Sequence, residues 1–101
     1  MKLSDEAIRM LNTSGIPDYM HQGIVYYYNE GIEPGDFLSA VINNDLKGAF
    51  RYADSTNIAH VIDYLRWFYW YAPSQTWGYP GAVATYLEEF WAQKALAESS
   101  A

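Results

Sequence analysis

The stretch Ile58–Ala72, IAHVIDYLRWFYWYA, has the pattern of one amphipathic helix that is aromatic on nearly every side of its C-terminal half. Its apolar residues recur at intervals of three and four, as they do on a single buried helix face. Trp67, Trp70 and Tyr71 fall outside this phase, so we expect other helices, a second copy of the chain or a ligand to cover them. The residues predicted to be buried are Val61, Ile62, Leu65, Phe68, Tyr69 and Ala72.

Capping residues, prolines and glycines divide the rest of the chain into further short helices. No window alternates at period two for long enough to predict a strand. The chain is therefore predicted to be all-α: one helical domain over 1–101, built as a compact bundle of five or six short helices. It would begin with a short helix and turn over 1–15 and end in a frayed tail over 97–101. The predicted helices cover 5–11, 17–29, 36–53, 58–72 and 80–96.

The segment 36–53 carries apolar residues in one helical phase that includes Leu46 and Phe50. Asn43, Asn44 and Asp45 interrupt it, and such residues favour helix caps over helix interiors. We predict two helices that meet there, with Asn44 or Asp45 capping the second; a single bent helix is the alternative.

Composition limits the possible functions. The chain has no apolar run long enough to span a membrane and no apolar core of a secretory signal near its N-terminus. It has no cysteine, which excludes disulfides and thiolate chemistry. Its net charge is −6, and its six basic residues are scattered singly, unlike the basic patches of nucleic-acid-binding proteins. We expect a cytoplasmic protein that binds neither membranes nor nucleic acids.

Polar residues gather between Asn43 and Arg66. One interpretation is a pocket in which Arg51 holds an anion and Asn57 recognises a hydrogen-bonding edge. The favoured interpretation is structural: Asp54 and Asn57 cap a helix while Arg51 pairs with an acid.

The sequence gives little sign of catalysis. His60 and Asp63 share a helix face, but two metal ligands without a third do not predict a metal site. No phosphate-binding glycine loop or nucleophile elbow is present. We therefore predict no catalytic residues, metal or cofactor and a protein that is not an enzyme; a hydrolase using Asp45 or His60 is the least favoured alternative.

Aromatic residues are concentrated near the C-terminus: eleven of the 28 residues from Tyr64 to Trp91 are Phe, Tyr or Trp. They can form a dense core, a protein interface rich in Trp and Tyr, or a platform on which a nucleotide-like ligand stacks. The same excess predicts homo-oligomerisation. The full set of candidate binding residues is Arg51, Asp54, Asn57, Arg66, Trp67, Trp70, Tyr71 and Trp77.

Three segments resemble a pattern found in small uncharacterised proteins encoded by phages and prophages. The matching residues are Ile16, Pro17 and Met20, then PGDFLSAVINNDLKGAFRYAD over Pro34–Asp54, then APSQTWG over Ala72–Gly78. Tyr52 departs from that pattern, which runs directly from Arg to Ala-Asp. The resemblance covers roughly residues 16–78.

This resemblance implies an accessory protein of a phage or mobile element that acts by binding in the host cytoplasm. The expected partner is a host protein that the chain inhibits or modulates through an aromatic surface. The alternative is a sponge-like binder of a small nucleotide-type signal.

Overall fold

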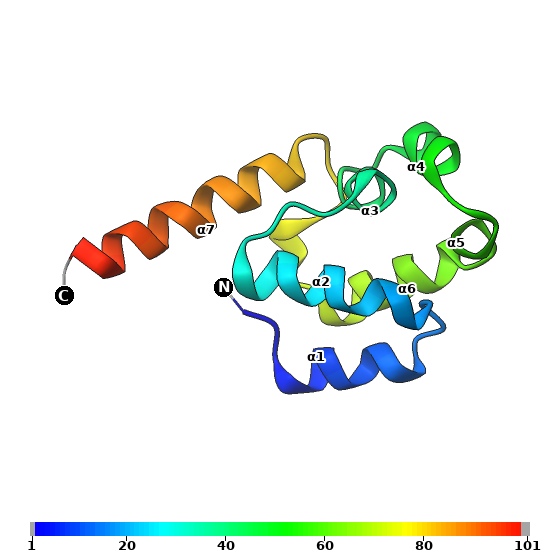
Figure 1. Ribbon diagram of the computed structural model, residues 1–101, viewed down its shortest axis with the longest axis horizontal. Helices are drawn as coiled ribbons and strands as arrows, with labels where there is room; N and C mark the ends of the chain where they lie inside the picture. Colours follow the sequence, from blue (N-terminus) through cyan, green and yellow to red (C-terminus); the bar gives the residue numbers. More distant parts are fainter. Residues whose placement is uncertain (1, 100–101) are drawn as a thin grey trace.

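The computed structural model describes residues 2–99, and over these residues the chain is helical without a β-strand, which confirms the all-α prediction. The helices form a globule from which the last one extends (Figure 1). They are α1 (Asp5–Met10), η1 (Leu11–Thr13), α2 (Asp18–Glu30), α3 (Asp36–Ile42), α4 (Leu46–Tyr52), α5 (Ser55–Ala59), α6 (Val61–Tyr71), η2 (Ser74–Thr76) and α7 (Ala82–Ser99), where η marks a short 3₁₀ helix.

Side-chain caps begin three of the helices. The Ser4 hydroxyl accepts a hydrogen bond from the Ala7 amide at 3.0 Å. The carboxylates of Asp45 and Asp54 accept from backbone amides in the first turns of α4 and α5, at 2.9 and 2.6 Å. These bonds satisfy amide groups that have no partner inside the helix. The division of 36–53 into two helices is confirmed, with Asp45 as the cap of the second.

The prediction of one continuous helix over Ile58–Ala72 is wrong, because the chain divides at His60. This residue ends α5 and precedes α6 with φ −116°, outside the helical range. Its ring nitrogen Nδ1 donates to the Asp63 carboxylate at 2.8 Å, one turn into α6. The division adds α5 as a separate helix, so the described residues contain seven α-helices instead of the predicted five or six.

The core lies where α2, α3 and α6 meet, and it is largely aromatic. Tyr28 on α2 and Phe68 on α6 have ring centroids 6.5 Å apart, and Phe37 on α3 lies edge-on to Tyr64 on α6. The fully buried large side chains are Trp67, Tyr27, Tyr28, Tyr64, Phe68, Leu11, Ile24, Leu38 and Ile42.

The buried face of α6 differs from the predicted one. Trp67 was expected to point away from the core, yet only 1% of it is exposed, and Tyr64 is fully buried. Ile62 and Tyr69, predicted to be buried, are exposed. The polar tips of the two buried α6 rings both have partners: the Trp67 indole N–H donates to the Ala7 carbonyl at 3.0 Å, and the Tyr64 hydroxyl donates to the Asn57 amide oxygen at 2.6 Å. A satisfied Trp or Tyr buries more area than an aliphatic residue.

The predicted phase also fails at α4, where Leu46 and Phe50 are 79% and 74% exposed. Asn44, just before α4, has a positive φ of 58° and turns the chain sharply. A helical phase is not preserved across such a turn, so the outward-facing residues of α4 cannot be deduced from α3.

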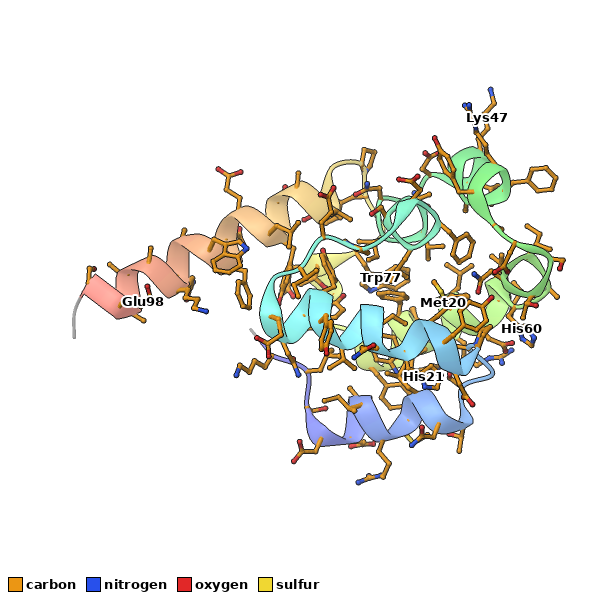
Figure 2. The ribbon with its side chains drawn as sticks, viewed as in Figure 1. Met20, His21, Lys47, His60, Trp77 and Glu98 are labelled. Atoms are coloured by element: carbon orange, nitrogen blue, oxygen red, sulfur yellow. The ribbon has the colours of Figure 1, made fainter. Side chains whose placement is uncertain are left out.

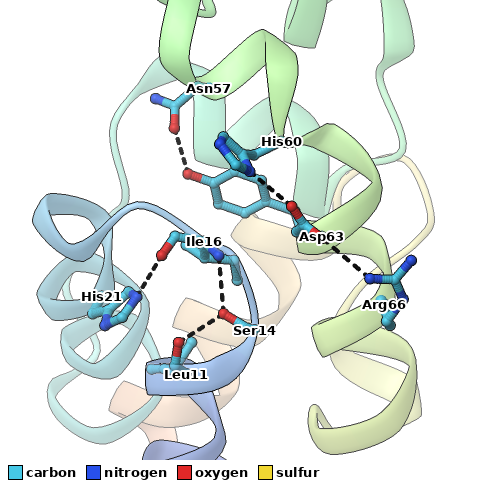
Figure 3. A network of polar contacts seen from close by, with 9 residues as sticks. Leu11, Ser14, Ile16, His21, Asn57, His60, Asp63 and Arg66 are labelled. Carbon is cyan, nitrogen blue, oxygen red and sulfur yellow. Dashed lines mark hydrogen bonds and ion pairs between the residues drawn. The ribbon is translucent and has the colours of Figure 1, made fainter.

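Backbone groups in the connection between α1 and α2 are satisfied locally. The Ser14 hydroxyl donates to the Leu11 carbonyl and accepts from the Ile16 amide, and His21 donates to the Ile16 carbonyl at 2.7 Å (Figure 3). This connection orders the turn before α2 and places α1 against α6, where Trp67 reaches Ala7.

Helix α7 packs against the rest of the chain between Ala82 and Trp91. Ala82, Val83 and Tyr86 are buried, and the Trp91 indole N–H donates to the Gly31 carbonyl at 3.0 Å. Beyond that point α7 projects away from the other helices and continues to Ser99 (Figure 1). Residues 97–99 of the expected tail are thus helical, whereas 100–101 lie outside the described residues. Over 2–99 no helix has the length and apolar character needed to cross a lipid bilayer.

Candidate functional site

Asp54 and Asn57, two of the predicted binding residues, both serve the local structure. Asp54 caps α5 and also accepts a hydrogen bond from the Tyr19 hydroxyl at 2.6 Å. Asn57 is buried, and its amide oxygen accepts from the buried Tyr64 hydroxyl at 2.6 Å (Figure 3). The structural interpretation is confirmed for Asp54 alone: the Asn57 side chain is a core hydrogen-bond partner and not a helix cap, and over residues 2–99 no ion pair joins Arg51 to an acid.

The Tyr19–Asp54 hydrogen bond changes the acidity of both groups. Because the hydroxyl donates to the ionised carboxylate, it lowers the pKa of Asp54 below its ordinary value, and it raises the pKa of Tyr19. The bond ties α2 to the start of α5.

His60, Asp63 and Arg66 form a row along the start of α6. Asp63 lies between the other two, accepting from His60 at 2.8 Å and from Arg66 at 3.1 Å (Figure 3). Over residues 2–99 no three His, Asp or Glu side chains are gathered as a metal site requires. Arg51 lies apart from this row, with its guanidinium 5.5 Å from the centre of the Tyr52 ring.

An aromatic surface occupies the C-terminal part of α6, and we define it by Arg66, Tyr69, Trp70 and Tyr71. Tyr69 and Trp70 are 70% and 69% exposed, with their rings nearly perpendicular and 5.3 Å apart. Arg66 lies one turn before Trp70 and is oriented by Asp63. The surface therefore presents two large rings and a guanidinium side by side on a rigid helix.

Part of this surface borders a small pocket of about 140 Å³ between α6 and η1. Arg66, Trp70 and Tyr71 line it, with the buried Trp67 beneath them. The structure thus brings four predicted binding residues together. Trp77 is not among them: its ring packs 5.4 Å from Phe68, toward the middle of the molecule (Figure 2).

A second apolar feature, the α4–α6 groove, was missed by the sequence reasoning. It runs between α4 on one side and α5 and α6 on the other, and it has a volume of about 680 Å³. Its lining is almost entirely aliphatic and aromatic, with Lys47 at its edge. The signal was present in the spacing of Ile58 and Val61, but Val61 was assigned to the core. The groove is lined by Leu46, Lys47, Ala49, Phe50, Ile58 and Val61.

A third, more polar cavity of about 590 Å³ lies between η2 and α7. Gln75 and Tyr79 line one side, and Thr85 and Glu89 line the other. At this cavity α7 does not pack tightly against the globule.

Comparison of the chain with protein families, curated proteins and solved structures found no match.

Proposed function

We propose that this protein acts by binding another protein through the aromatic surface of α6. The observation that supports the proposal best is the pair Tyr69 and Trp70, each more than two-thirds exposed although both are large and apolar. Burying such rings against a partner releases water from apolar area, which is the main driving force of most protein association.

The residue types also favour a protein partner. Trp, Tyr and Arg are the residues most enriched among those that contribute strongly to protein–protein affinity. Here Arg66 is already oriented by Asp63, and the Tyr69 ring stands against the Trp70 ring. Side chains that are ordered before binding lose less conformational entropy in the complex. A matching partner would offer an apolar pocket for Trp70 with a hydrogen-bond acceptor for Arg66.

A nucleotide-type signal is supported less well. Pockets that enclose small ligands usually have volumes of about 300–1,000 Å³. The pocket beside Arg66, Trp70 and Tyr71 measures about 140 Å³, and Trp67 forms its buried floor. A pocket of this size is too small to enclose a nucleotide, so the residues that line it are better suited to contact the surface of a partner protein.

Binding rather than catalysis is also proposed because the polar side chains have structural tasks. Asp45, Asp54 and Asn57 serve as caps or core hydrogen-bond partners. With a net charge of −6, the chain is attracted electrostatically to partners that carry positive charge. The proposed setting is a host cytoplasm, where an accessory protein of a phage or mobile element would modulate a host protein; that origin stays a prediction from the resemblance.

The proposal is tested by a pull-down from bacterial lysate with three immobilised proteins. The wild type and the double variant Tyr69→Ala, Trp70→Ala form the comparison. Tyr26→Ala is the matched control, because Tyr26 is an aromatic residue that is 42% exposed on α2, outside the aromatic surface. We expect a protein that is retained by the wild type and the control but lost from the double variant. Equal retention by all three would contradict the proposal.

A further inference from the structure

We propose that the cavity between η2 and α7 binds a small organic cation, namely a primary amine with an apolar body. The cavity has a volume of about 590 Å³, and sites that enclose small ligands usually measure about 300–1,000 Å³. It shares no lining residue with the aromatic surface of α6, so this proposal and the proposed function can fail independently. The chemistry of the lining, its rigidity and an unpartnered hydroxyl behind it support the proposal.

Aromatic rings line the cavity, which lies between the first turns of α7 and the yellow segment of Figure 1 that contains η2. Tyr86 and Phe90 lie one turn apart on α7, and their ring centroids are 6.3 Å apart. Tyr79, in the connection between η2 and α7, adds a third ring. The face of an aromatic ring attracts a nearby ammonium group, and the rings also bury the apolar part of a ligand. The lining therefore suits a ligand that is both cationic and partly apolar.

The charge of the lining is negative. Among residues 2–99, Glu89 is the one charged residue of the lining, and it forms no ion pair. Lys94, the base of α7, lies over the Trp91 ring, 5.1 Å from the ring centre. A carboxylate that has no cationic partner in the protein attracts a cationic ligand and repels the phosphate of a nucleotide. The cavity therefore favours cations over anions.

Acceptors for a primary ammonium lie in a row on α7. Thr85, Glu89 and Gln93 follow one another at intervals of four residues, so they share one helix face, and all three line the cavity. A primary ammonium has three N–H donors, and the hydroxyl, carboxylate and amide oxygens of this row are acceptors. A quaternary ammonium has no N–H to donate. The row therefore favours a primary amine.

The inner part of the lining is held by hydrogen bonds within the protein. The Tyr86 hydroxyl donates to the Tyr28 carbonyl at 2.7 Å, and the Tyr28 hydroxyl lies 2.8 Å from the buried Thr76 hydroxyl. The Tyr79 hydroxyl donates to the Gln75 carbonyl at 3.0 Å. A site whose side chains are already ordered loses less conformational entropy when a ligand binds.

A buried hydroxyl behind the lining has no hydrogen-bond partner. It belongs to Tyr27, and among residues 2–99 no other buried side-chain oxygen or nitrogen lacks a partner. Burial raises the pKa of Tyr27, and the hydroxyls of Tyr28, Tyr86 and Tyr79 raise it further. Tyr79 and Tyr86 line the cavity, and the Tyr27 and Tyr86 ring centroids are 4.8 Å apart. Such unpartnered groups are rare in native structures, and departures of this kind are typical of functional sites.

Three probes of similar shape and different charge test the proposal. Phenethylamine is a cation at neutral pH, phenethyl alcohol is neutral, and phenylacetate is an anion. Each is titrated into the isotope-labelled full chain and followed by heteronuclear NMR. We expect phenethylamine to shift the side-chain amide signals of Gln75 and Gln93, which line the cavity, and to bind about tenfold more tightly than the alcohol. Phenylacetate should not bind.

Glu89→Gln and Glu88→Gln are matched variants. Each removes one acid from α7, and both side chains are exposed, so neither substitution should disturb the fold. Glu88 is not part of the lining. Glu89→Gln should weaken the binding of phenethylamine about tenfold and leave that of the alcohol unchanged, because the carboxylate acts on the cation alone. Glu88→Gln should bind both probes like the wild type.

Four results would overturn the proposal. Phenylacetate or adenosine monophosphate would bind at least as tightly as phenethylamine, or phenethylamine would show no saturable binding up to millimolar concentrations. The amine would shift signals elsewhere in the chain but not those of Gln75 and Gln93. Glu88→Gln would weaken its binding as much as Glu89→Gln does, which would indicate attraction to the net charge of the chain and not to this cavity.

Discussion

Replacement of Asn57 by alanine tests whether this residue is structural. Its amide oxygen is the acceptor for the Tyr64 hydroxyl at 2.6 Å, and both side chains are buried. In Asn57→Ala the hydroxyl keeps its buried position but loses this acceptor. A buried polar group left without a partner costs about 1–3 kcal/mol. We therefore expect the free energy of unfolding to fall by about that amount.

Urea denaturation followed by circular dichroism measures the change. For a domain of this size the free energy falls by about 1–3 kcal/mol per molar urea, so the midpoint should fall by about 1 M. Asn12→Ala, a substitution of an exposed asparagine, serves as control and should stay within about 0.5 kcal/mol of the wild type.

A double-mutant cycle separates the hydrogen bond from other effects of the substitution. Tyr64→Phe removes the donor, and combining it with Asn57→Ala removes both partners. If the two groups depend on each other, the double variant loses less stability than the two single variants together, by about 0.5–3 kcal/mol. Full additivity, with Asn57→Ala as stable as the control, would refute the reasoning and leave Asn57 available for a ligand.

Three further predictions concern glycines, tyrosines and the Asp54 cap. Gly31 has a left-handed φ of 66°, and a Cβ there would collide with the Phe90 ring, so Gly31→Ala should destabilise by about 1–2 kcal/mol or more in thermal unfolding. The helical Gly23 has open space around it, and Gly23→Ala should stabilise by about 0.5–1 kcal/mol. Burial raises the pKa of four tyrosines, that of Tyr86 to about 12. Unfolded tyrosines ionise near pH 10, so the stability that these neutral, buried tyrosines contribute should be fully present below that pH and should fall as the pH rises above it. Absorbance at alkaline pH should show that these four tyrosines ionise at higher pH than the exposed ones. The four buried tyrosines are Tyr27, Tyr28, Tyr64 and Tyr86. Because the pKa of Asp54 is lowered in the folded state, its ionised carboxylate stabilises the fold at pH values above the ordinary aspartate pKa. This stabilisation is lost as the pH falls through the lowered pKa. In Tyr19→Phe, stability should therefore fall less on acidification, as measured by urea midpoints between pH 5 and 2.

Local signals predicted the helix boundaries well. Ser4 caps α1 and Asp45 caps α4 as predicted, whereas the run from Asp54 to Asn57, predicted to precede a helix at Ile58, supplies the cap and the first three residues of α5. Caps are set by bonds between residues three positions apart, so the sequence contains both partners. The break at His60 was not predicted, because a His and an Asp three residues apart can also form a hydrogen bond within a continuous helix.

The orientation of α6 could not be predicted from its own residues. Both faces are apolar, so periodicity alone does not decide which face is buried. The choice depends on partners elsewhere: the Ala7 carbonyl for Trp67 and the Asn57 amide for Tyr64. The first of these is 60 residues away in sequence. At α4 the turn at Asn44 interrupts the helical phase, and Leu46 and Phe50 lie outside the core beside a groove that the sequence did not reveal.

Hydroxyl-radical footprinting with mass spectrometry, on the free chain and on its complex with the captured partner, tests the central claim most directly. In the free chain Trp70 should oxidise readily and the buried Trp67 should not, although they are three residues apart. On binding, Tyr69 and Trp70 should become protected, while the exposed Tyr26 on α2 keeps its rate. Unchanged oxidation of Tyr69 and Trp70 in a complex that protects other residues would contradict the account.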